Sequence, residues 1–413
     1  MMLFLSNFKS TVLLSFLICS SCGNPTKPST VQAVNDTTAS SAQKTEPVMV
    51  AANRTEEYIP LLQGKKIAVV ANQTSVIFKK DTYTHLVDSL LSLKVTIKKV
   101  FAPEHGFRGN MDAGEKVLDD TDSKTGHPLI SLHGKNRKPS QEQLGDIDMV
   151  LFDIQDVGVR FYTYIATLQL VMEACAEKGI RVMVLDRPNP NAHYVDGPTM
   201  KKEHTSFLGM TEIPLVYGMT IGEYAQMINE EGWLDANKKA DLTVIPIQNW
   251  TRDMEYPLSI RPSPNLPSDV AINIYPSLGL FEGTNVNAGR GTEFQFQRYG
   301  ASFMDSTAYN FSYIPKPNFG SKYPKEEGKR CYGKDLSNIA RMNEVSLLWL
   351  MDAYHNTTDK SKFFLTAGFT KHAGTERLQK QIEDGLSEKE IKATWQADLE
   401  KFKLVREKYL RYE

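Results

Sequence analysis

Carboxylate side chains beside turn-forming residues are the part of this sequence best suited to chemistry. Glu104 lies in the segment 102–109, Ala-Pro-Glu-His-Gly-Phe-Arg-Gly, with Phe101 and Phe107 on either side. Apolar neighbours exclude water and favour the protonated form of a carboxyl group, which can then give its proton to a leaving oxygen. Glu104 is therefore our candidate general acid. The alternative is that it forms an ion pair with Arg108 and only shapes the loop.

Two aspartates form a second candidate group. Asp153 and Asp156 flank a short segment that precedes Gly158. A carboxylate at such a place can activate a water molecule or stabilise an oxocarbenium-like transition state. Asp156 is equally well placed to cap a helix that begins near Phe161. We keep Asp156 as a candidate catalytic residue and Asp153 as a candidate substrate contact, with the capping role open.

The second half of the chain supplies two more carboxylates, Glu282 and Glu293, in glycine-containing loops. Glycosidic bonds are hydrolysed by two carboxyl groups on opposite sides of a cleft, one as acid and the other as base or nucleophile. Glu282 is our candidate for the second catalytic group. Glu293, Asn285 and Arg290 are candidate substrate contacts.

A polar turn with two prolines follows another apolar run. Asp186, Arg187 and Asn189 lie in the segment 186–190, Asp-Arg-Pro-Asn-Pro. This pattern resembles a clamp for sugar hydroxyls. An Asp–Arg pair that holds the proline-rich turn would explain it equally well.

The sequence lacks the motifs of several other functional classes. It contains no Gly-x-Gly-x-x-Gly or Walker-type loop, no His-Glu-x-x-His and no Gly-x-Ser-x-Gly. Nucleotide, zinc and serine-hydrolase chemistry are therefore unsupported, and we expect neither a cofactor nor a metal. We expect His105 to form hydrogen bonds in its loop. The formal net charge of -1 gives no indication of nucleic-acid binding.

Short apolar runs alternate with helical patterns through the first half. The alternation predicts a Rossmann-like, doubly wound parallel sheet of the α/β class, because parallel strands need crossover helices between them. The predicted strands are 66–71, 95–101, 149–152, 181–185 and 242–247, and the predicted helices are 83–93, 162–178, which Gly179 ends, and 220–231.

Polar residues follow four of these strands, at 72–75, 103–106, 153–156 and 186–189. The carboxyl ends of parallel strands lie at one edge of the sheet, where ligands bind in open α/β folds. The sequence therefore predicts an active site at that edge.

The character of the chain changes near residue 256, where proline- and glycine-rich segments begin. We predict a Rossmann-like domain over 58–255 and a smaller α+β domain over 256–413, with the cleft between them. One charged helix is expected over 387–412. Its inward-facing residues would be Ile391, Trp395, Leu399, Phe402 and Val405.

The amino-terminal end has the pattern of a bacterial lipoprotein. Residues 1–22 contain Lys9, a short apolar run and then Cys-Ser-Ser-Cys-Gly, so Cys22 is the predicted lipidated residue. An ordinary cleaved signal is the alternative. Residues 23–57 lack apolar periodicity and predict a flexible tether. We therefore expect the protein in the cell envelope, anchored by lipid to the membrane and facing the periplasm or lying at the outer membrane.

Five motifs in the same order together resemble the NamZ-type exo-β-N-acetylmuramidases. They span 102–109, 153–164, 186–190, 261–267 and 281–292. The resemblance implies a Rossmann-like domain joined to a smaller one, a cleft between them, and release of N-acetylmuramic acid from peptidoglycan pieces. It places the family's proposed catalytic glutamate on Glu104. The chain departs from the family at Gln295 and Gln297, which leaves the second catalytic group open.

Our leading hypothesis is therefore an exo-acting hydrolase that acts on the non-reducing end of MurNAc-GlcNAc fragments. Arginine binds carboxylates in a bidentate way, which makes it a natural partner for the lactyl group of muramic acid. The alternatives are a non-catalytic glycan-binding lipoprotein and a hydrolase for another N-acetylated amino sugar. The candidate substrate contacts are His105, Arg108, Asp153, Arg160, Tyr162, Asp186, Arg187, Asn189, Asn285, Arg290 and Glu293.

Overall fold

The computed structural model describes residues 46–109 and 119–413. Cys22, the signal segment and most of the predicted tether lie outside the described residues. The tether prediction is wrong for its last part, because residues 46–57 are folded. Met49 pairs with Gln248, Ala51 and Ala52 are buried, and helix α1 runs from Thr55 to Leu62.

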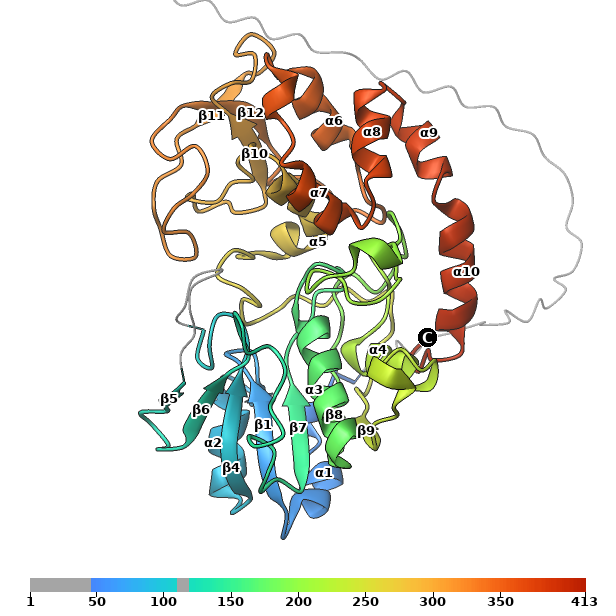
Figure 1. Cartoon of the computed structure of the whole chain (residues 1–413). Helices are drawn as coiled ribbons and strands as arrows, with labels where there is room; N and C mark the ends of the chain where they lie inside the picture. Colours follow the sequence, from blue (N-terminus) through green and yellow to red (C-terminus); the bar gives the residue numbers. More distant parts are fainter. Residues whose placement is uncertain (1–45, 110–118) are drawn as a thin grey trace, which may run out of the picture. The chain divides into compact units, whose positions relative to one another are not determined.

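A seven-stranded sheet forms the first half (Figure 1), in the order β5-β6-β4-β1-β7-β8-β9. All neighbouring strands pair in parallel except β5, which pairs antiparallel with β6. Without β5, this is the strand order of dinucleotide-binding folds, with the direction of winding reversed beside β1. The predicted fold class is confirmed. The strands are β1 Lys66–Ala71, β4 Thr96–Ala102, β5 Asp120–Thr121, β6 Pro128–Ser131, β7 Met149–Asp153, β8 Arg181–Leu185 and β9 Leu242–Ile245.

Alternate residues of the central strands belong to two separate hydrophobic clusters. Val150 and Phe152 of β7 pack in a cluster that includes residues of α3 (Tyr164–Lys178) and α4 (Ile221–Glu230). Met149 and Leu151 pack in the other cluster, with residues of α1 and α2 (Leu86–Ser92). Since successive side chains of a strand point to opposite faces, each face of the sheet has its own core. This explains the continuous apolar runs in the sequence.

One predicted helix begins later than expected. Tyr83–His85 forms strand β3, which pairs with β2 (Val76–Phe78), and α2 starts only at Leu86. The ring of His85 accepts a hydrogen bond from the backbone N–H of Val87 at 3.3 Å, so His85 acts as the N-cap. The side-chain cap sets the start of the helix, and the apolar periodicity that we read from residue 83 begins beyond it.

The second half contains a smaller sheet and a group of helices, as predicted. Three antiparallel strands lie in the order β10-β12-β11. The elements are α5 Asp269–Leu278, η4 Gly279–Gly283, β10 Arg298–Ala301, β11 Phe311–Tyr313, β12 Cys331–Asp335, α6 Leu348–His355, α7 Thr366–Ala373, α8 Arg377–Glu383, α9 Glu388–Ala393 and α10 Gln396–Glu407. Residues 46–413 form one compact unit.

The predicted single helix at the end of the chain is two helices. It breaks at Thr394 and Trp395, between α9 and α10. The indole N–H of Trp395 donates to Asp196 in the first half at 3.2 Å, which draws this residue inward and off the line of one straight helix. Ile391, Leu399 and Phe402 are buried as expected, along with Trp395.

Two further features concern the cysteines and the membrane. Cys175 and Cys331 are free thiols, and both are buried. In the part of the chain that the structure describes, no helix combines the length and the apolar character needed to cross a bilayer.

Candidate active site

A cavity of about 710 Å³ lies where the two halves of the chain meet. The first half contributes Glu104 and His105, which follow β4, the segment 161–164 at the start of α3, and Leu208. The second half contributes the segment 263–266, Tyr275, Glu282, Arg290, Phe296, the segment 320–325 and His372. Two glutamates from different halves, the candidate catalytic residues Glu104 and Glu282, thus line one cavity.

Glu104 is held at the cavity by the start of α3. Thr163 donates its hydroxyl to Oε2 of Glu104 at 3.1 Å, and the hydroxyl of Tyr164 donates to the backbone carbonyl of Glu104 at 3.3 Å. The next residue, His105, has a φ of 70°, which is uncommon for a residue with a side chain. Its ring lies 3.2 Å from the hydroxyl of Ser263 in the second half. These contacts fix the carboxyl group at the edge of the sheet.

Glu282 is held as an anion. Nε of Arg290 donates to its carboxylate at 3.1 Å. Burial acts to raise the pKa of Glu282, but the charges of Arg290 and Lys325, together with the hydrogen bond from Arg290, outweigh burial and lower the pKa to about 2. At neutral pH this carboxylate is therefore ionised, which suits a base, a nucleophile or a stabiliser of positive charge.

Lys325 positions the backbone around Glu282. Its ammonium donates to the carbonyls of Phe281 at 3.0 Å, Glu282 at 3.0 Å and Thr284 at 2.6 Å. Carbonyl groups at the end of a helical turn lack partners within the turn, and a cation satisfies them. Gly283 completes the arrangement, because a Cβ atom there would lie 2.3 Å from the backbone of Phe369 in α7.

His372 of α7 also lines the cavity. Its Nδ1 lies 2.9 Å from the carbonyl of Gly368 and must carry the hydrogen, since a carbonyl only accepts. Burial lowers the pKa of His372, so the ring is neutral at neutral pH and offers Nε2 as an acceptor. The ring packs on Phe161, with centroids 5.4 Å apart.

Arg160 joins the two halves beside this histidine. Its buried guanidinium donates to the carbonyls of Pro198 (2.6 Å) and Ile213 (2.9 Å) in the first half. It also donates to the carbonyls of His372 (3.0 Å) and Ala373 (2.8 Å), at the end of α7. Burial lowers the pKa of Arg160 to about 9. The prediction that Arg160 binds substrate is therefore corrected: its donors are used to hold α7 in place, and it does not line the cavity.

Aromatic rings from both halves form one wall of the cavity. Tyr275 makes edge contacts with Phe161 at 5.1 Å, Phe296 at 4.8 Å and Tyr162 at 6.2 Å between centroids. Tyr162, a predicted substrate contact, lines the cavity, and its hydroxyl donates to the carbonyl of Pro262 at 2.7 Å. A rigid aromatic surface with a few polar groups is typical of a small-molecule site.

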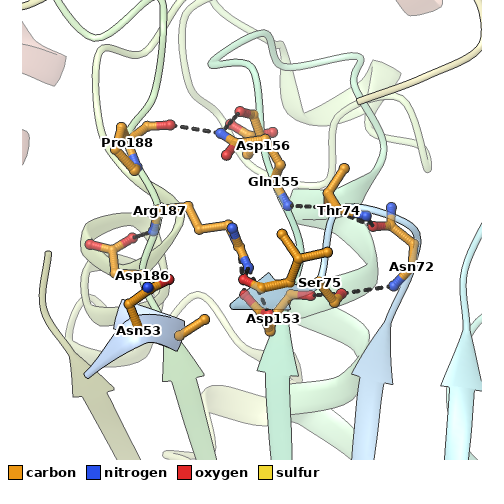
Figure 2. Close-up of polar contacts among 12 residues, drawn as sticks. Asn53, Asn72, Thr74, Ser75, Asp153, Gln155, Asp156, Asp186, Arg187 and Pro188 are labelled. Atoms are coloured by element: carbon orange, nitrogen blue, oxygen red, sulfur yellow. Dashed lines mark hydrogen bonds and ion pairs between the residues drawn. The ribbon is translucent and has the colours of Figure 1, made fainter. Parts of the chain in front are cut away.

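Several predicted contacts lie instead in a buried network at the carboxyl edge of the sheet. Figure 2 shows Arg187 pointing toward Asp153, and the two form a bidentate ion pair at 2.6 and 2.8 Å. Both side chains are buried, and neither lines the cavity. The expectation that they bind substrate is corrected, because the two side chains neutralise each other in a buried ion pair.

Asp156 and Asp186 are likewise buried away from the cavity. Asp156 accepts from the N–H of Gly158 at 2.7 Å and from the hydroxyl of Tyr217, and burial raises its pKa to about 6. Asp186 accepts from Thr220, from the N–H of Gly222 and from Tyr412, and burial raises its pKa to about 6 as well. The structure therefore corrects the catalytic role predicted for Asp156 and the sugar clamp predicted for Asp186.

The remaining predicted contacts are also outside the cavity. Arg108 forms a bidentate pair with Asp122 at 2.9 and 2.8 Å. Asn189 donates to the carbonyl of Met219 at 2.8 Å, and Asn285 donates to that of Lys362 at 2.6 Å. Glu293 is exposed and does not line the cavity.

Sequence reasoning missed the residues that complete the site. Lys325, His372 and Tyr275 lie in segments without motif or periodic signal, and only the fold brings them to Glu282. No group of three or more His, Cys, Asp or Glu side chains within residues 46–109 and 119–413 is arranged to hold a metal ion.

Two carboxyl groups lining one aromatic-walled cavity, one of them held ionised, are what a glycoside hydrolase site requires. The comparisons with known proteins agree. The family model described as exo-beta-N-acetylmuramidase NamZ, N-terminal, matches residues 67–270, and the corresponding C-terminal model matches 273–412. The chain therefore belongs to the NamZ exo-β-N-acetylmuramidase family and is a glycosidase.

Individual relatives support the assignment. The peptidoglycan beta-N-acetylmuramidase NamZ of Bacillus subtilis is 38% identical over 374 residues, which are 86% of this chain and 89% of that protein. Two crystal structures of DUF1343 family proteins from Bacteroides fragilis are also similar. One has a TM-score of 0.81 at 43% identity and the other 0.73 at 26%, each over 89% of this chain and 99% of the other.

Proposed function

We propose that this glycosidase releases N-acetylmuramic acid from the non-reducing end of peptidoglycan fragments, with Glu104 as the general acid. The observation that carries the proposal is the pairing of Glu104 and Glu282 across one cavity. The name of the Bacillus subtilis relative, a peptidoglycan β-N-acetylmuramidase, supports the substrate class.

The charge state of Glu282 supports the division of roles. Because Arg290 and Lys325 keep Glu282 ionised, it is unsuited to donate a proton at neutral pH. Glu104 is the other glutamate that lines the cavity, and it is the one proposed to donate. Its proton passes to the glycosidic oxygen, the bond from C1 of the sugar to that oxygen breaks, and the bonding electrons stay on the oxygen. The Glu282 carboxylate stabilises the resulting positive charge or activates the incoming water.

Arg290 supports recognition of muramic acid. Of the arginines that the sequence predicts as substrate contacts, Arg290 is the one that lines the cavity. Its Nε is bonded to Glu282, and a guanidinium has further N–H donors for a second carboxylate. We propose that these donors bind the lactyl group, which is the feature that separates N-acetylmuramic acid from N-acetylglucosamine.

Purified enzyme should be incubated with two disaccharides, MurNAc-GlcNAc and GlcNAc-MurNAc, written with the non-reducing sugar first, and the products followed by mass spectrometry. The proposal expects free N-acetylmuramic acid and N-acetylglucosamine from the first and no cleavage of the second. Equal cleavage of both, or binding of the first without turnover, would contradict it.

We further propose that Cys22 carries lipid and holds the enzyme at the cell envelope. The support is the sequence pattern Cys-Ser-Ser-Cys-Gly after a short apolar run. Labelled palmitate should be incorporated into the full-length chain in bacterial cells and should be lost in Cys22→Ser. Equal labelling of both chains would refute the anchor and leave the hydrolase proposal intact.

A further inference from the structure

The segment 318–325 places an exposed aromatic ring at the cavity. Tyr323 lines the cavity and is 90% exposed. Large aromatic side chains are more often partly buried, because water is a poor environment for their rings. A ring that stays in water beside a cavity is available to stack on a ligand.

The segment that carries Tyr323 is tied down on both sides of the ring. Asn265 donates to the carbonyl of Gly320 at 2.7 Å, and Asn318 donates to the carbonyl of Thr292 at 3.0 Å. On the other side, Lys325 is bonded to three carbonyls of the Glu282 turn. A ligand that stacks on Tyr323 therefore pays little conformational entropy to order the backbone.

The position of the ring relative to the carboxylates indicates which part of the substrate it meets. Arg290, Glu282 and the Tyr275 wall are buried or half-buried, so they form the inner part of the cavity. An exo-acting enzyme holds the terminal sugar in that inner part, and the rest of the fragment leaves through the mouth. The exposed ring of Tyr323 belongs to the mouth.

We propose that Tyr323 is the platform for the sugar on the leaving-group side of the scissile bond, the N-acetylglucosamine of MurNAc-GlcNAc. The apolar C–H face of that sugar stacks on the ring. This inference rests on the proposed function, and it makes Tyr323 a residue that selects glycan leaving groups over small ones.

The test compares two substrates that differ only in the leaving group. MurNAc-GlcNAc has a sugar that can reach Tyr323, whereas β-MurNAc fluoride has only a fluorine atom there. Tyr323→Ala should raise KM for the disaccharide about tenfold, the size expected for one aromatic stacking contact. It should leave kcat/KM for the fluoride unchanged, and Tyr323→Phe should restore the disaccharide KM because the ring remains.

Phe319 provides a matched control. It is an aromatic residue of the same segment, is 57% exposed and does not line the cavity. Phe319→Ala should leave both substrates unaffected. The inference is overturned if Tyr323→Ala changes both substrates equally, changes neither, or affects only fragments with a stem peptide. If the unaltered enzyme cleaves neither MurNAc substrate, the proposed function fails as well. If the unaltered enzyme cleaves both substrates but Tyr323→Ala does not show the expected difference between them, only the inference about Tyr323 is overturned.

Discussion

Removing the positive charge of Arg290 should change the pH at which the enzyme works. In the native protein Arg290 donates to Glu282 at 3.1 Å and lies over the ring of Phe296 at 5.1 Å. Arg290→Met keeps an unbranched apolar side chain in that space but removes the charge and the hydrogen bond. Glu282 then keeps its burial and loses its strongest cationic partner.

The size of the effect follows from the pKa of Glu282. That pKa is lowered from 4.5 to about 2, a difference that corresponds to about 3 kcal/mol in favour of the carboxylate. Because burial opposes this shift, the cations together contribute more than the net amount. Without Arg290 we expect the pKa of Glu282 to rise, because burial still acts to raise it and Lys325 is the main cation left to oppose burial.

The lowered pKa of Glu282 also makes the free energy of unfolding depend on pH. A carboxyl group with a lowered pKa in the folded state stabilises the fold above its unfolded pKa, and that contribution is lost as pH falls through the folded value. In the native enzyme Glu282 therefore contributes fully above pH ~4.5 and loses its contribution between pH ~4.5 and ~2. Arg290→Met should abolish this contribution.

The assay is the pH dependence of kcat/KM on MurNAc-GlcNAc from mildly acidic to neutral pH. The native enzyme should show no acid limb from Glu282 in this range, whereas Arg290→Met should gain one. Arg181→Met is the control, because Arg181 pairs with Asp241 on the surface at 2.9 Å. An Arg290→Met profile without an acid limb, like that of the native enzyme, would refute the reasoning.

Two further variants test residues that the structure places outside the cavity. Asp156→Asn should keep glycosidase activity. Burial raises the pKa of Asp156 in the folded protein from 3.8 to about 6, so the free energy of unfolding of the native protein should fall by up to ~3 kcal/mol as the pH rises across that window. In urea unfolding at several pH values, Asp156→Asn should lack this fall. Loss of activity in a variant that still folds would show that Asp156 takes part in the reaction. Arg160→Met should lower the free energy of unfolding by about 2–4 kcal/mol, because four carbonyls lose a charged donor, and an unchanged urea midpoint would contradict the clamp.

The strands β1, β7 and β8 could be predicted because they are buried on both faces and therefore appear as continuous apolar runs. The strands β5 and β6 were not predicted, because they are short and largely exposed. The start of α2 and the break before α10 could not be predicted, since each depends on one side chain. His85 caps α2, and Trp395 reaches Asp196 across the fold. Periodicity records which face of a helix is apolar, and it does not record where a cap or a tertiary hydrogen bond interrupts the helix.

The candidate site could be predicted only in part. Glu104 and Glu282 both line the cavity. Glu104 follows the end of strand β4, and Glu282 lies in the short helix η4 between two glycines. Asp153 and Arg187 have the same sequence signature as Glu104 but satisfy each other in the buried network. Sequence order does not reveal whether a polar side chain at the sheet edge faces the cavity or a neighbouring loop. The role of Lys325 could not be predicted, because its ammonium binds three backbone carbonyls and every residue type has such a carbonyl.

The proton donated by Glu104 is the central claim, and leaving-group dependence tests it most directly. Glu104→Gln and the unaltered enzyme should be compared on MurNAc-GlcNAc, whose leaving oxygen needs a proton, and on β-MurNAc fluoride, whose leaving group does not. The account predicts that Glu104→Gln lowers kcat/KM on the disaccharide by ~10²–10⁴-fold and leaves the fluoride reaction far less affected. Equal losses on the two substrates, or full activity on the disaccharide, would contradict it.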